Sequence, residues 1–173
     1  MFRRLRASAE LTHDAETDPL TQLANRRTFA RALTTMRAGD ALVLVDLDHF
    51  KDVNDRHGHQ VGDETLRVLA RDLRDTARQV DCVARYGGEE FAVVLPEAGI
   101  EGAQAMLHRF RRVWHSHQPL TTFSAGIARH EPGRSPRETL RLADAALYAA
   151  KAAGRNCDML AAESEAEVEI VLG

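Results

Sequence analysis

Residues 82–95 read CVARYGGEEFAVVL, and this stretch decides the fold. Gly87 and Gly88 separate two short β-prone runs, a pattern that favours a tight β-hairpin. The turn ends in Glu89 and Glu90, directly beside an apolar strand. Carboxylates are costly to place near a core unless they are paired or bind a cation. Taken alone, however, the pattern favours an ordinary tight turn over a functional site.

A second group of carboxylates follows the apolar run at 41–45, which suits a strand buried on both faces. If this strand neighbours the hairpin, Asp46 and Glu89 can face one another. Two hard oxygen ligands with open positions suit Mg²⁺, which takes the rest of its shell from water and substrate phosphates. Two such ions, roughly 3.5–4 Å apart, would activate an attacking oxygen and stabilise a leaving one. The alternative for Asp46-Leu47-Asp48 is a helix-capping turn.

Hydrophobic periodicity places the remaining elements around this pair. Helices are expected at 26–36 with Asn25 as N-cap, at 50–56, 61–77 and 103–114, and from Pro136 to Gly154; strands are expected at 41–45, 82–86, 91–95 and 121–128. This order predicts an α/β fold of the α+β sandwich type, in which helices flank a mainly antiparallel central sheet that carries the hairpin. Polymerase palms and nucleotidyl cyclases share this plan, and so do many unrelated proteins, so the fold alone does not decide the function.

The chain of 173 residues fits one domain, expected at 18–160, with a helical lead-in or linker at 1–17 and a tail at 161–173 that is either a strand or disordered. A net charge of −3 argues against a general nucleic-acid or membrane binder. No run of 18 apolar residues occurs that could span a membrane. The two cysteines, Cys82 and Cys157, lack metal-ligand spacing and are interpreted as reduced thiols of a cytoplasmic protein. Trp114 is expected in the core, and His108, His115 and His117 are expected in surface or packing positions.

Three cationic residues are candidates for binding phosphates. Lys51 lies five residues after Asp46, and Lys151 and Arg155 are an i, i+4 pair at the end of the last helix. Arg offers a fork and Lys a point charge to a triphosphate. The alternative for the helical pair is a favourable interaction with the helix C-terminus, worth about 0.3–1 kcal/mol. Isolated from other motifs, the pair favours this alternative.

Asn54 and Asp63 are candidates for reading a base, because they flank the turn His57-Gly58-His59 between two expected helices. Guanine presents N1–H and N2–H₂ donors, which an aspartate accepts, and an asparagine amide can satisfy O6, N7 or N3. A carboxylate built for those donors rejects adenine, which leaves it unpaired. Without further context the two residues are helix caps or solvated positions.

Four segments occur in an order that resembles the GGDEF family over roughly residues 18–156. They are DPLTQLANRR at 18–27; DLDHFKDVND at 46–55 with Gly58-His59 and Gly62-Asp63; RYGGEEF at 85–91; and Ala143-Asp144 through Tyr148, Lys151 and Gly154-Arg155-Asn156. Each motif is modest on its own, and the four in this order are very specific. The resemblance implies a diguanylate cyclase, which joins two GTP molecules into cyclic di-GMP.

The resemblance also implies roles for single residues. Asp46, the backbone carbonyl of Leu47 and Glu89 would hold two Mg²⁺ (or Mn²⁺) ions per half-site, and Glu89 would also serve catalysis as metal ligand or proton acceptor. Lys51 would contact phosphate and stabilise the transition state. The substrate-binding set would be completed by Lys151 and Arg155 on the triphosphate, Asn54 and Asp63 on guanine, and Gly87 and Gly88 at the phosphates. Asp48, Glu90 and His59 have less defined, supporting roles.

Regulation is implied by Arg78-Gln79-Val80-Asp81, which resembles the family's inhibitory RxxD site for the product, with Arg109 as a secondary arginine. The alternative for Arg78 and Asp81 is a helix-end ion pair. Each domain would bind one GTP, so catalysis would require a transient C₂ homodimer. Two rival functions stay open: a degenerate domain that binds GTP or cyclic di-GMP without turnover, and a cyclase that makes a monomeric cyclic nucleotide. One departure from the family is the short connection, about four residues, before the strand at Thr121.

Overall fold

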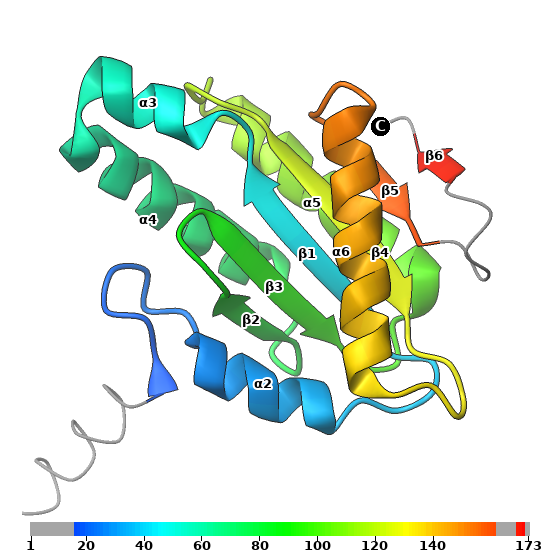
Figure 1. The fold of residues 1–173 in the computed structure, drawn as a ribbon. Helices are drawn as coiled ribbons and strands as arrows, with labels where there is room; N and C mark the ends of the chain where they lie inside the picture. The colour runs from blue at the N-terminus through cyan, green and yellow to red at the C-terminus, as the bar shows by residue number, and fades with distance from the viewer. Residues whose placement is uncertain (1–15, 162–168, 172–173) are drawn as a thin grey trace, which may run out of the picture.

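The computed structural model describes residues 16–161 and 169–171 (Figure 1). Its elements, in chain order, are α2 (Arg26–Thr34), β1 (Ala41–Leu47), α3 (Phe50–His57), α4 (His59–Thr76), β2 (Cys82–Arg85), β3 (Glu90–Leu95), α5 (Gly99–Ser116), β4 (Phe123–Arg129), α6 (Pro136–Ala152), β5 (Asp158–Leu160) and β6 (Glu169–Val171). Every helix and strand expected within residues 18–160 is present, with ends displaced by a few residues. The expected lead-in at 1–17 lies almost entirely outside the described residues, as does most of the expected tail.

The described strands form one sheet in the order β2-β3-β1-β4-β5-β6. The pair β4–β5 is parallel, and the other neighbouring pairs are antiparallel. The mainly antiparallel sheet predicted from the sequence is therefore confirmed. The strand β5 was not expected; it covers the side of β4 that faces away from β1. The short connection before β4 therefore does not leave β4 at the edge of the sheet.

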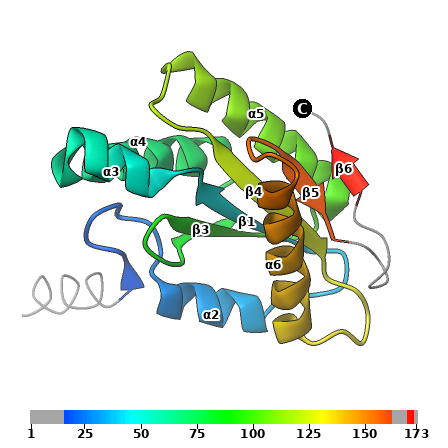
Figure 2. The ribbon, with the colours of Figure 1, turned by 45° about the horizontal axis from the view of Figure 1, so that its top comes forward.

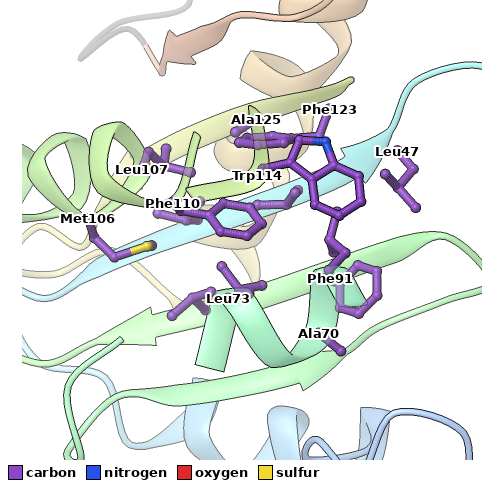
Figure 3. Close-up of a cluster of buried hydrophobic side chains, with 14 of the residues drawn as sticks. Leu47, Ala70, Leu73, Phe91, Met106, Leu107, Phe110, Trp114, Phe123 and Ala125 are labelled. Carbon is purple, nitrogen blue, oxygen red and sulfur yellow. The ribbon is translucent and has the colours of Figure 1, made fainter. Parts of the chain in front are cut away.

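Helices cover both faces of the sheet, and Figure 2 shows α5 and α2 on opposite sides of it. On one face, side chains of α3, α4 and α5 pack with Val43, Val45 and Leu47 of β1 in the larger core. Figure 3 shows part of this core, where Phe110, Trp114 and Phe123 gather over the strands. Trp114 is 1% exposed, and its indole N–H donates to the carbonyl of Thr121 at 3.0 Å, so its predicted place in the core is confirmed.

On the opposite face, α2 and α6 pack against Leu42 and Leu44 of β1 and against β3. The expected N-cap is confirmed, since Asn25 Oδ1 accepts from the N–H of Thr28 at 3.0 Å. The helix α6 begins with Ser135 as N-cap and Pro136 in its first turn. Within the described part of the chain, no helix combines the length and the hydropathy of a membrane span.

Candidate active site

The tip of the β2–β3 hairpin and the helix pair α3–α4 enclose a cleft of about 410 Å³. It is lined by Phe50, Lys51, Asn54, Asp55, His59, Asp63, Leu66, Arg85, Gly88 and Glu89. The structure thus brings together the predicted phosphate lysine, both predicted guanine readers and the predicted catalytic glutamate. The cleft has polar groups at the hairpin and along α3, with apolar Phe50 and Leu66 on its walls, as expected for a nucleotide base beside its phosphates.

Asp46 and Glu89 lie at the end of β1 beside the hairpin. The register pairs Asp46 with Glu90, and the N–H of Leu47 donates to the carbonyl of Glu89 at 3.3 Å. Burial raises the pKa of Asp46, against the lowering effect of Lys151. Burial also raises the pKa of Glu89, and the negative charge of Asp46 adds to this. A carboxylate whose ionisation is opposed by burial and by a neighbouring negative charge, as at Glu89, is typical of a site that takes up positive charge.

Lys151 supplies some of that charge, since its Nζ lies 2.8 Å from Asp46 Oδ2. Arg155 follows α6, and its positive charge also lowers the pKa of Asp46. Neither cation lines the cleft on the α3–α4 side. Lys151 lies near the end of α6 and Arg155 in the turn after it, and α6 packs on the other face of the sheet. Lys151 and Arg155 therefore lie apart from the residues that line the α3–α4 cleft.

The arrangement at Asp46 fits a divalent metal ion. Asp46 is buried, 6% exposed, and its carboxylate is compensated in this structure by the ammonium group of Lys151. Carboxylate and carbonyl oxygens form the donor set that Mg²⁺ prefers. Among the described residues no group of three or more His, Cys, Asp or Glu side chains gathers as a metal cage. Such a sparse donor set fits an ion that takes most of its ligands from phosphates and water.

The side chain of Asn54 lies directly over Gly62, on the neighbouring helix. A Cβ at position 62 would stand 1.9 Å from Asn54 Oδ1 and 3.0 Å from its Cγ. Any side chain there would displace the amide that faces the cleft. Gly62 therefore makes room for the predicted guanine reader, a role that the sequence pattern did not reveal.

Arg85 is a further residue whose role the sequence pattern missed. Its guanidinium donates to the carbonyl of Gly88 at 2.8 and 3.1 Å, and to the carboxylate of Asp18 at 3.1 and 3.3 Å. Asp18 is also held by the N–H and hydroxyl of Thr21. Burial alone would raise the pKa of Asp18, but these hydrogen bonds and the charge of Arg85 outweigh it and lower that pKa. Arg85 thus braces the hairpin tip against the segment that precedes α2.

The three residues with less defined roles lie in different surroundings. Asp48 is 2% exposed and accepts hydrogen bonds from two hydroxyls and one backbone N–H. The carboxylate of Glu90 lies over Gly87, where a Cβ would stand 2.4 Å from Glu90 Oε2. His59 begins α4 and lines the cleft.

The predicted inhibitory motif lies between α4 and β2. The guanidinium of Arg78 donates to both oxygens of Asp81 and to the carbonyl of Pro96. Arg109 reaches the same end of α4, where its NH2 donates to the carbonyl of Thr76 at 3.5 Å. A hollow of about 250 Å³ adjoins Arg78 and Asp81. The ion pair and a nearby second arginine are both present, so the geometry accommodates either interpretation of the motif.

The sequence of the chain is also similar to that of a known protein family. Residues 15–157 match the family model described as "Diguanylate cyclase, GGDEF domain".

The chain belongs to the GGDEF family. It is 42% identical over 156 residues to Diguanylate cyclase DgcP of Pseudomonas aeruginosa, a match that covers 82% of this chain and 23% of that protein. It is 39% identical over 162 residues to Diguanylate cyclase DgcM of Escherichia coli (strain K12), which covers 87% of this chain and 40% of DgcM. The chain therefore spans less than half the length of these curated relatives.

The fold is also similar to that of solved GGDEF structures. The crystal structure of the coiled coil and GGDEF domain of DgcB from Caulobacter crescentus, in complex with c-di-GMP, has a TM-score of 0.84 at 36% sequence identity. The match covers 92% of this chain and 93% of that chain. Both the sheet and the flanking helices of this GGDEF domain are thus of the palm-like type expected from the sequence.

Proposed function

We propose that this GGDEF domain, residues 18–160, is a diguanylate cyclase that condenses two GTP molecules into cyclic di-GMP and releases pyrophosphate. The observation that carries the proposal is the cleft that holds Lys51, Asn54, Asp63 and Glu89 together, with Asp46 at the end of the adjoining strand. The activity named for the relatives DgcP and DgcM supports it.

Asp46, the carbonyl of Leu47 and Glu89 would hold Mg²⁺ or Mn²⁺, two ions per half-site, which when bound supply Lewis-acid stabilisation of the reacting oxygens. The chain itself binds and orients. Asn54 and Asp63 receive the guanine, and Lys51 stabilises charge on the phosphates. Lys151 and Arg155 add positive charge from the side of α6. Positioning and fixed charge of this kind dominate catalysis of phosphoryl-group transfer.

In the reaction, the 3′-oxygen of one GTP forms a bond to the α-phosphorus of the other, and the bond from that phosphorus to pyrophosphate breaks. The proton of the 3′-hydroxyl passes to Glu89 or to water. The same step in the opposite sense closes the ring. One cleft receives one GTP, so two chains would meet face to face in a transient C₂ homodimer. GTP as substrate and two free thiols fit a cytoplasmic location.

Feedback by the product at Arg78, Asp81 and Arg109 is part of the proposal. The supporting observation is that the guanidinium groups of Arg78 and Arg109 lie at the same end of α4, and that Arg78 and Asp81 line an open hollow. Guanidinium groups suit the phosphates and guanine edges of a cyclic dinucleotide.

The test is to incubate the chain with GTP and Mg²⁺ and resolve the products by chromatography, with Glu89→Ala as control. Cyclic di-GMP is expected from the wild-type chain and not from the variant. Unreacted GTP at high chain concentration would instead favour the receptor without turnover, and a monomeric cyclic nucleotide would favour the other cyclase. Activity per chain should fall on dilution, because the dimer is transient.

A further inference from the structure

Asp48 lies two residues after Asp46, yet its surroundings are different. Its Oδ1 accepts from the hydroxyl of Ser124 at 2.7 Å, and its Oδ2 accepts from the hydroxyl of Thr122 at 2.6 Å and from the N–H of Asn156 at 3.1 Å. Both oxygens are thus engaged by donors of the chain, and the residue is 2% exposed. A buried carboxylate satisfied in this way is fixed in the fold.

The partner at Asn156 belongs to a constrained turn after α6. Three successive residues have positive φ: Gly154 at 114°, Arg155 at 66° and Asn156 at 51°. Positive φ is uncommon for residues other than glycine and persists where surrounding contacts hold it. Here the N–H of Asn156 is held by Asp48, and its side chain accepts from Arg111 NH1 at 2.8 Å.

Arg155 lies inside this turn, between two anchors. Its N–H donates to the carbonyl of Ala150 at 3.0 Å, which is the closing bond of the α6 C-terminus. On its other side, Asn156 is tied to Asp48. These contacts fix the backbone that carries the guanidinium of Arg155, which donates to the carbonyl of Lys151 at 3.5 Å, beside the ammonium group that pairs with Asp46.

We propose that Asp48 is a positioning residue for Arg155, and not a ligand of the metal. By holding the N–H of Asn156, it keeps Arg155 in the conformation that presents its side chain to the triphosphate. The inference rests on the proposed function, in which Arg155 binds the phosphates of GTP.

The test compares two probes: a GTP analogue with a methylene group between its α- and β-phosphates, which cannot release pyrophosphate, and GMP, which lacks the β- and γ-phosphates. Asp48→Asn should weaken binding of the analogue about ten-fold or more, the loss expected for one charge-assisted hydrogen bond, and binding of GMP less than about two-fold. Titration calorimetry with Mg²⁺ present measures both.

Asp40→Asn is the matched control, because Asp40 precedes β1 whereas Asp48 follows it. Asp40 is 5% exposed and accepts from the N–H groups of Arg37 at 2.7 Å and Glu97 at 2.9 Å. This variant should lower the melting temperature as Asp48→Asn does but leave the ratio of the two affinities unchanged. If Asp48→Asn does not fold, Asn156→Ala takes its place as the test variant. Asn156 is exposed, and alanine at this position disfavours the positive φ of the turn and removes the hydrogen bond from Arg111. This variant should lower the affinity for the GTP analogue relative to the affinity for GMP, as Asp48→Asn does.

Equal weakening of both probes in Asp48→Asn and Asn156→Ala would overturn the inference. So would a raised Mg²⁺ requirement with an unchanged ratio, which would indicate that Asp48 acts on the metal. If the wild-type chain binds neither probe, the proposed function itself fails, and the inference falls with it. That outcome is distinct, because it appears before any substitution is made.

Discussion

The substitution Gly126→Ala tests how closely α6, which carries Lys151, packs on the sheet. Gly126 lies in the middle of β4, opposite Leu44 of β1, and α6 passes directly over it. A Cβ at this position would stand 2.2 Å from the carbonyl oxygen of Ala143 and 2.3 Å from the backbone nitrogen of Leu147. Ordinary contact begins near 3.4 Å, so α6 would have to move away by about 1 Å.

The expected cost is large because the atoms in the way are backbone and cannot rotate aside. Overpacking of a core costs about 1–3 kcal/mol and occasionally more, and we expect about 3 kcal/mol here. For a domain of this size, that lowers the melting temperature by about 6–12 °C. Because α6 carries Lys151 at 2.8 Å from Asp46, turnover of GTP should also fall about 100-fold.

Thermal unfolding followed by circular dichroism measures the first effect, and the rate of cyclic di-GMP formation the second. Gly88→Ala is the control for stability, because a Cβ there meets no heavy atom within 4 Å. Its melting temperature should stay within about 2 °C of the wild type. An equally small change in Gly126→Ala would refute the close packing of α6 on β4.

Three further predictions concern separate parts of the site. Gly62→Ala should raise the KM for GTP about ten-fold by displacing Asn54, yet have little effect when added to Asn54→Ala. Steady-state kinetics of the single and double variants measures this, and additive effects on KM would contradict it. Asp18→Asn should cost about 1–2 kcal/mol at neutral pH and less at low pH, as urea unfolding across pH would measure. The pKa of Asp18 is lowered in the folded protein, so the stabilisation by its carboxylate is present above the ordinary pKa of 3.8 and is lost as the pH falls through the pKa of the folded state. A difference in unfolding free energy between wild type and variant that does not change with pH would refute the contact with Arg85. Arg78→Ala should raise the concentration of cyclic di-GMP that half-inhibits turnover at least about ten-fold, and an unchanged concentration would count against the feedback site.

Most of the sheet could be predicted from the sequence because its strands are signalled locally. The run 41–45 is apolar throughout, and Gly87-Gly88 separates two β-prone runs. The local sequence pattern therefore predicts both β1 and the hairpin. The strand β5 could not be predicted in this way. It has three residues, too few to establish a period, and it exists because its backbone pairs in parallel with β4.

The candidate site, too, could be predicted from the sequence only in part. The cleft residues lie in motifs whose order in the chain could be read directly, and the structure brings Lys51, Asn54, Asp63 and Glu89 into one place. The link from Arg85 to Asp18 spans 67 residues and depends on tertiary packing. The resemblance assigns Asp46 to the metal and gives Asp48 a supporting role, but the hydroxyls and the N–H that hold Asp48 come from distant segments, so these contacts are known only from the structure.

A site that joins two GTP molecules has a characteristic reaction stoichiometry, which can be measured. GTP consumed, pyrophosphate released and cyclic di-GMP formed should be quantified in the same samples over time, with Mg²⁺ present. We expect two GTP consumed and two pyrophosphates released for each cyclic di-GMP formed, and no product with Glu89→Ala. Release of pyrophosphate without cyclic di-GMP, or equal product from the variant, would contradict it.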